Sequence, residues 1–136
     1  MKKQKVQHNV VMLIDDNDID NFINERMIRG CNFAETCYVN TSTMSAIEFL
    51  KNLSVKKDLD ANYLPSVIFL DINMPMLDGF QFIEEFEKLD KKITEPVSIV
   101  MLTSSINPAD MERSKKYPSV KGFFHKPLTE EQLSSI

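Results

Sequence analysis

Apolar residues in this sequence gather in short runs that are separated by stretches of helical spacing. The runs are rich in β-branched side chains and alternate little with polar residues, which is typical of strands buried on both faces. We predict strands at residues 9–14, 36–39, 67–70, 97–102 and 120–124. Gly122 interrupts the last of them.

Between these strands, the spacing of apolar residues predicts five helices. The first lies between Asp18 as N-cap and Gly30 as terminator. Its apolar positions are Ile19, Phe22, Ile23 and Met27. The other helices are predicted at 45–53, after the loop marked by Asp78 and Gly79, after the Asn107 cap and Pro108, and after the Thr129 to Gln132 capping box. The second of these carries Phe82, Ile83, Phe86 and Leu89.

The alternation of strands and helices predicts the fold class. Such a chain forms a parallel sheet with helices on both faces, joined by right-handed crossovers. We therefore expect an α/β fold with a flavodoxin-like, doubly wound sheet of five strands in the order 2-1-3-4-5. Ligands of such sheets bind beyond the carboxyl ends of the strands, near the point where the strand order reverses.

The composition fits one globular domain. The chain has 136 residues and a formal charge of -4, and its short lysine pairs are scattered, which argues against a nucleic-acid partner. No apolar run approaches the ~20 residues that span a bilayer, and no secretory signal is present, so we expect a cytoplasmic protein. Cys31 and Cys37 match no metal spacing; we expect reduced packing residues, with a bridge between them left open.

Reactive residue types follow the predicted strands. Asp15 and Asp16 come after the first strand, Asp71 after the third, Thr103 after the fourth and Lys126 after the fifth. Because the first and third strands are neighbours in the predicted order, the three carboxylates converge at one edge of the sheet. Two such charges ~4 Å apart repel by about 4 kcal/mol at an effective dielectric of ~20, so the cluster requires a cation or raised pKa values.

Magnesium suits an all-oxygen site of this kind, since Mg²⁺ takes one or two carboxylates together with water and phosphate oxygens. A carboxylate beside Mg²⁺ and a lysine can act as a nucleophile toward phosphorus. The hydroxyl of Thr103 and the ammonium of Lys126 can then hold phosphoryl oxygens. A P-loop or dinucleotide site is excluded, because the glycine-rich motifs are missing and the chain has only 3 Gly.

Four segments carry a resemblance to a known family: residues 13–17 (LIDDN), 70–79 (LDINMPMLDG), 102–104 (LTS) and 123–127 (FFHKP). In residue type, order and spacing they resemble the receiver domains of two-component response regulators, of which the chemotaxis regulator is the small, single-domain example. We expect residues 1–8 to form a basic N-terminal tail and residues 9–136 to form the receiver domain.

The resemblance implies a role for each carboxylate. Asp71 is then the phosphoacceptor, and it takes a phosphoryl group from a phosphohistidine of a sensor kinase or a phosphotransfer protein of a phosphorelay. Asp15 and Asp16 lie at the Mg²⁺ ion together with Asp71. The main-chain carbonyl of Asn73 is a further Mg²⁺ ligand.

The remaining implied roles concern the response to phosphorylation. Thr103 is the switch hydroxyl, Lys126 pairs with the phosphoryl group, and Phe123 is the rotating aromatic. The family also implies a cis peptide between Lys126 and Pro127. We expect a signalling protein and not an enzyme, a monomer or weak dimer whose output is contact with another protein.

Two other functions stay open. One is a receiver-like binding module that works without phosphorylation. Such a module would typically lack Asp71, Lys126 or the acidic pair Asp15 and Asp16, all of which are present. A phosphatase of the haloacid dehalogenase type would need a second Asp two positions after the nucleophile, where this chain has Asn73.

Two departures from the family concern length. The connection at 54–65 is longer than usual, which indicates either a partner-specific surface or a solvated excursion. The last predicted helix, 129–136, spans barely two turns. Two explanations stay open: the chain is truncated, or a further domain follows it.

Overall fold

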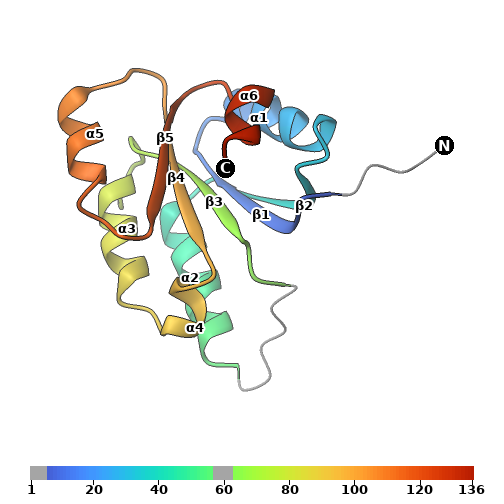
Figure 1. Cartoon of the computed structure of the whole chain (residues 1–136). Helices are drawn as coiled ribbons and strands as arrows, with labels where there is room; N and C mark the ends of the chain where they lie inside the picture. The colour runs from blue at the N-terminus through green and yellow to red at the C-terminus, as the bar shows by residue number, and fades with distance from the viewer. Residues whose placement is uncertain (1–5, 57–62) are drawn as a thin grey trace.

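A computed structural model describes residues 6–56 and 63–136, and its elements alternate as the sequence predicts (Figure 1). The strands are β1 (His8–Ile14), β2 (Ala34–Asn40), β3 (Val67–Asp71), β4 (Ser98–Thr103) and β5 (Val120–His125). The helices are α1 (Asp18–Gly30), α2 (Thr43–Ser54), α3 (Gly79–Glu87), α4 (Lys91–Thr94), α5 (Pro108–Ser114) and α6 (Glu130–Ser134). The parallel strands lie in the predicted order, β2-β1-β3-β4-β5.

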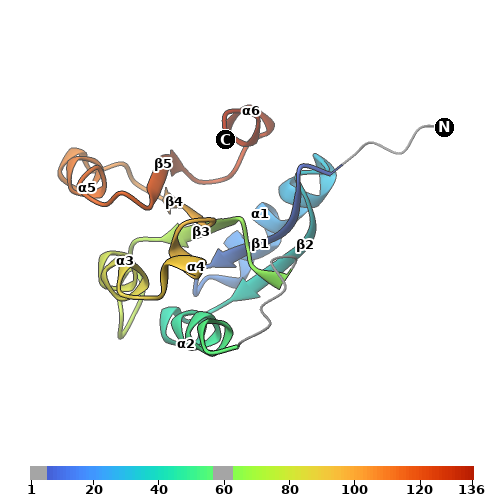
Figure 2. The ribbon, with the colours of Figure 1, turned by 60° about the horizontal axis from the view of Figure 1, so that its bottom comes forward.

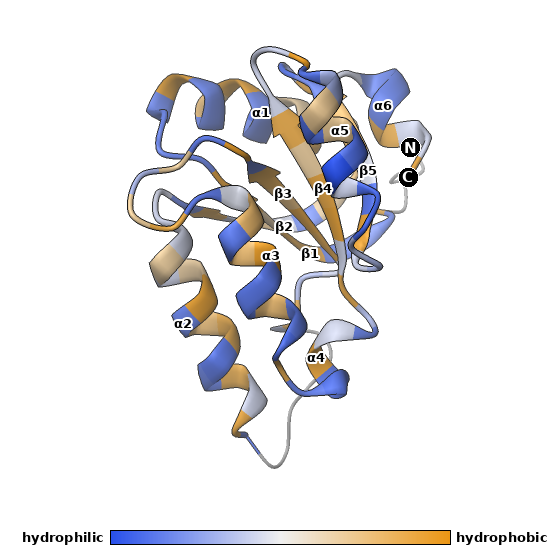
Figure 3. Ribbon diagram, turned by 90° about the vertical axis from the view of Figure 1, so that its left-hand side faces the viewer, coloured by the Kyte–Doolittle hydropathy of each residue, from blue (hydrophilic) through white to orange (hydrophobic). Residues whose placement is uncertain are grey.

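The sheet separates two apolar layers. Side chains alternate along a strand, so neighbouring residues of β1 enter different layers: Met12 packs with α2 and α3, whereas Leu13 packs with α1 and α6. Figures 1 and 2 show α1 and α6 on one face of the sheet and α2 and α3 on the other. Figure 3 shows the apolar strands between helices of mixed polarity. The uninterrupted apolar runs in the sequence therefore reflect burial on both faces.

Three details of the helices differ from the sequence prediction. Asn17, and not Asp18, is the N-cap of α1: its side chain accepts the N–H of Asp20 at 3.0 Å, and Asn caps helices as well as Asp does. Gly30 ends the helix without a positive φ; the left-handed residue is Asn32 (φ 52°), which tolerates this conformation. The short helix α4 was not predicted, because four residues are too few for a periodic pattern.

Helix α1 is present as predicted, but much of its apolar pattern faces outward. Ile19 and Phe22 are 70% and 60% exposed, and Ile23 is also exposed. The buried residues of the helix are Asn21, Asn24 and Ile28. Helical spacing identified the helix correctly, yet it did not identify the face that packs on the sheet.

The two buried asparagines explain why polar residues face the sheet and apolar residues face outward. Each of them forms a hydrogen bond with a main-chain group at the carboxyl edge of the sheet. The Asn21 side chain donates to the carbonyl of Asp15 at 2.8 Å. Asn24 Oδ1 accepts the buried N–H of Leu128 at 2.9 Å. A buried main-chain group without a partner would be destabilising, so polar residues on this face anchor the loops after β1 and β5.

The other sequence features have mixed outcomes. Cys31 and Cys37 are free thiols. The capping box of Thr129 and Gln132 opens α6 as predicted. Part of the long connection, residues 57–62, lies outside the described residues. Among the helices of the described residues, none is long and apolar enough to cross a bilayer.

The inverted polarity of α1 predicts an unusual response to mutation. We expect Asn24→Leu to lower the free energy of unfolding by about 1 to 3 kcal/mol, because the buried N–H of Leu128 loses its acceptor. Ile19→Gln on the exposed face should change it by less than about 0.5 kcal/mol. Urea unfolding of both variants checks this, and a larger loss in Ile19→Gln would show that the apolar face is the packed one.

Candidate functional site

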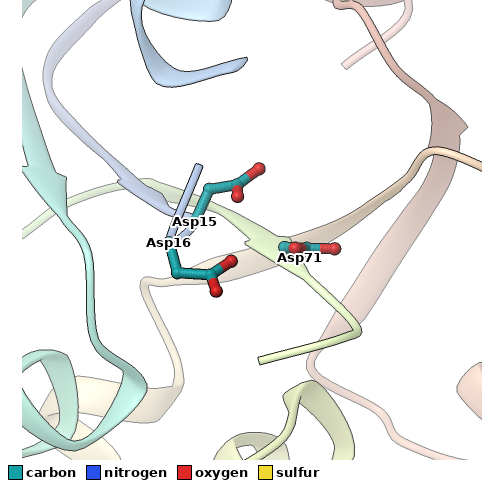
Figure 4. Close-up of side chains that lie close together, drawn as sticks. All are labelled: Asp15, Asp16 and Asp71. Carbon is teal, nitrogen blue, oxygen red and sulfur yellow. The ribbon is translucent and has the colours of Figure 1, made fainter. Parts of the chain in front are cut away.

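Three carboxylates meet where β1 and β3 end (Figure 4). Ile14 of β1 pairs with Leu70 of β3, so Asp15 and Asp71 follow as neighbours on adjacent strands. Together with Asp16 they offer one oxygen each, all within 4.8 Å of one another. Asp15 and Asp71 are buried, whereas Asp16 is exposed. The structure thus brings together the three carboxylates that the sequence predicted.

Lys126 extends into this cluster from the end of β5. Its main-chain N–H donates to the carbonyl of Thr103 at 2.8 Å, which fixes the backbone beside β4. The buried ammonium lies 2.5 Å from Asp15 Oδ2 and 3.6 Å from Asp71 Oδ2. The peptide bond between Lys126 and Pro127 is cis, as the resemblance implies. Lys126 is therefore the counter-charge of the cluster.

A fourth carboxylate, Asp20, also contacts this ammonium. Asp20 Oδ2 lies 3.0 Å from Lys126 Nζ, so the distance is shorter than the one to Asp71. Asp20 was not predicted from the sequence as part of the site. The available signal was its place in the first turn of the helix that starts at the same edge of the sheet.

Burial and charge shift the ionisation of the site. Burial raises the pKa of Asp71 to about 6; Lys126 acts in the opposite direction, and the charges of Asp15 and Asp16 add to the increase. Burial alone would lower the pKa of Lys126, but its bonds to Asp15 and Asp20 outweigh this and raise it. Lys126 is therefore charged at neutral pH.

Thr103, Asn73 and Phe123 are the other residues that the sequence predicted for this site. The buried Thr103 hydroxyl donates to the carbonyl of Ser105 at 2.8 Å, so it is engaged within its own loop. The N–H of Asn73 lies 3.4 Å from Asp71 Oδ1, at the long end of hydrogen-bond distances. Phe123 is half-buried and packs against the layer that contains α2 and α3.

The loop between Asp71 and α3 is tightly folded. A Cβ on Gly79 would lie 2.8 Å from the Cα of Ile72, so this position requires glycine. Met76 has a φ of 71° and is 86% exposed, an unfavourable backbone conformation for a residue with a side chain. The hydroxyl of Thr43 in α2 donates to the carbonyl of Leu77. These contacts hold the loop beside the acidic cluster.

The donor set fits a hard divalent cation. Carboxylate oxygens are the ligands that Mg²⁺ prefers, and none of the three residues at this edge offers nitrogen or sulfur. The ammonium of Lys126 lies among four carboxylates, those of Asp15, Asp16, Asp20 and Asp71. This excess of negative charge favours the binding of a cation.

Comparison with known proteins gives the same outline. The family model of the response regulator receiver domain matches residues 11–136. A two-component response regulator from Cytophaga hutchinsonii has a similar structure, with 32% identity, a TM-score of 0.84, and coverage of 97% of this chain and 94% of that one. The receiver domain of a sensor histidine kinase from Pseudomonas aeruginosa, which has a magnesium ion in its active-site cleft, is 18% identical with a TM-score of 0.70. The match covers 94% of this chain and 93% of that one and supports the fold.

A curated relative is much longer than this chain. Sensor histidine kinase CheAY of Helicobacter pylori is 26% identical over 127 residues, which cover 93% of this chain and 14% of that protein. The likeness therefore concerns one part of the kinase.

The raised pKa of Asp71 predicts a pH-dependent stability. Its folded pKa of about 6 lies above the usual value of an aspartate, 3.8, so the native protein holds the proton more tightly than the unfolded chain and loses stability as the pH rises from about 4 to 6. In metal-free buffer at pH 8, Asp71→Asn should be more stable than wild type by up to about 3 kcal/mol. The difference should vanish near pH 4.

Urea unfolding across this pH range checks the prediction. Asp18→Asn, which removes an exposed carboxylate at the start of α1, serves as the control and should show no such pH-dependent gain. If Asp71→Asn were no more stable than wild type at pH 8, this would show that the ionised carboxylate of Asp71 does not destabilise the folded protein.

Proposed function

The chain belongs to the family of response regulator receiver domains, and from this premise we propose that it accepts a phosphoryl group on Asp71. One observation carries the proposal: Asp71 is a buried carboxylate at the end of β3, within reach of two further carboxylates and of the Lys126 ammonium. A nucleophile, a metal-binding pair and a phosphate-binding cation are the groups that phosphoryl transfer requires.

The reaction is an in-line displacement at phosphorus. An oxygen of the Asp71 carboxylate forms a bond to phosphorus while the P–N bond of a phosphohistidine breaks, and the departing imidazole nitrogen takes up a proton. With a pKa of about 6, Asp71 is ionised and nucleophilic at neutral pH. The chemistry of the chain is limited to its own phosphorylation and dephosphorylation, so we class it as a signalling protein and not as an enzyme.

Residues at the sheet edge would stabilise the transferred group. Mg²⁺, held by Asp15, Asp16, Asp71 and the carbonyl of Asn73, would neutralise charge on the phosphoryl oxygens. Lys126 would donate to another oxygen. Thr103 would exchange its bond to the Ser105 carbonyl for a bond to the phosphoryl group.

This exchange couples phosphorylation to the surface of the protein. Movement of Thr103 and its loop would change the packing beside Phe123, which β5 places next to β4. Phe123 is half-buried, so a change in its position alters an accessible surface. Phosphorylation would thus shift an equilibrium between two surfaces, one of which binds a protein target.

The donor is a histidine kinase or a histidine phosphotransfer protein. Support comes from the curated relative that is called a sensor histidine kinase and carries a segment like this chain. The magnesium in the receiver domain from Pseudomonas aeruginosa likewise supports the assignment of Mg²⁺.

Incubation with acetyl phosphate and Mg²⁺ tests the proposed function. Intact-mass spectrometry should show the gain of one phosphoryl group by wild type, and no gain by Asp71→Asn or in excess EDTA. Asp78→Asn is the matched control: Asp78 lies in the same loop and caps α3, a role that Asn also fills, so this variant should be phosphorylated. An equal adduct on Asp71→Asn would contradict the proposal.

A further inference from the structure

The Lys126 ammonium has three N–H groups and three carboxylates around it. Asp15 and Asp20 lie at hydrogen-bond distance, 2.5 and 3.0 Å, and take two of these groups. Asp71 lies at 3.6 Å, beyond a normal hydrogen bond. The ammonium is therefore bound on two sides and held short of direct contact with the third carboxylate.

We propose that Asp20 is a positioning residue that keeps the Lys126 ammonium away from Asp71, so that a phosphoryl group can enter between them. This inference rests on the proposed phosphorylation of Asp71. Without Asp20, the ammonium would move toward Asp71, because opposite charges attract strongly in a buried site. Direct pairing would occupy the nucleophilic oxygens and close the space in which the phosphoryl oxygens must lie.

Asp20 is suited to this role because its own position is fixed. Its N–H is bonded to the cap residue Asn17, and the next residue, Asn21, ties α1 to the end of β1. Its carboxylate is 34% exposed, at a cavity of about 220 Å³ that is lined by Lys126, Pro127 and Ser104 as well. The cavity leaves room for a longer acidic side chain.

The opposite effect is expected if Asp20 acts only through its charge. Removal of a negative charge near the site would then help an anionic donor to approach, and phosphorylation would become faster. The sign of the change therefore separates a positioning role from a general electrostatic role.

The first experiment compares phosphorylation rates with acetyl phosphate and Mg²⁺. Asp20→Asn should be slowed roughly tenfold, which corresponds to one charge-assisted hydrogen bond at a partly exposed position. Asp20→Glu should recover most of the rate. Asp18→Asn removes the same charge from the same helical turn, and because Asp18 makes no ion pair with Lys126 in the described part of the chain, its rate should stay within about twofold of wild type.

The second experiment does not depend on phosphorylation. A crystal structure of Asp20→Asn should show Lys126 Nζ within hydrogen-bond distance of Asp71, about 2.7 to 3.0 Å. An ammonium that stays in place, or a rate for Asp20→Asn equal to or above that of wild type, would overturn the inference. A wild type that takes up no phosphoryl group would instead refute the proposed function, while the position of the ammonium would still test the role of Asp20.

Discussion

The carboxyl edge of this protein depends on one ammonium group. Lys126, at the end of β5, lies within 3.6 Å of carboxylates at the end of β1, in α1 and at the end of β3. Buried carboxylates without a counter-charge are strongly destabilising, so the lysine stabilises the arrangement in which the ends of these three elements lie together. The raised pKa of Asp71 shows that the compensation is incomplete. The same imbalance that strains the edge makes it suitable for a cation and for a phosphoryl group that is paired with one.

The inward-facing residues of helix α1 serve mainly to hold the groups at this edge, and only secondarily to fill the apolar core. Its inward asparagines hold the main chain after β1 and near the start of α6, and Asp20 holds the lysine. Ile19 and Phe22 consequently lie on the outer face. A helix that gave its inner face to apolar residues would pack well, but it would leave the loops of the site without their hydrogen-bond partners.

The strand order and the site at the strand ends could be predicted because they follow from strong local signals. Uninterrupted apolar runs define strands that are buried on both faces, and Asp15, Asp16 and Asp71 directly follow two of them. Asp20 and the inverted face of α1 could not be predicted in this way. Both depend on which side of a helix meets the sheet, and helical spacing carries no information on that point when polar residues satisfy buried main-chain groups. The engagement of Thr103 with Ser105 likewise depends on loop geometry.

The stability of Lys126→Met in metal-free buffer tests the central claim most directly. Lys126 is buried, and removal of one partner of a buried ion pair typically costs about 3 to 5 kcal/mol. We expect a loss of this size in the free energy of unfolding at pH 8 and partial recovery with Mg²⁺. Because the ammonium lowers the Asp71 pKa, Asp71 of the variant takes up its proton at a higher pH than in wild type, so the loss should become smaller as the pH falls toward 6. A variant as stable as wild type at pH 8, or a loss that is equal at every pH, would contradict the view that one ammonium holds this edge together.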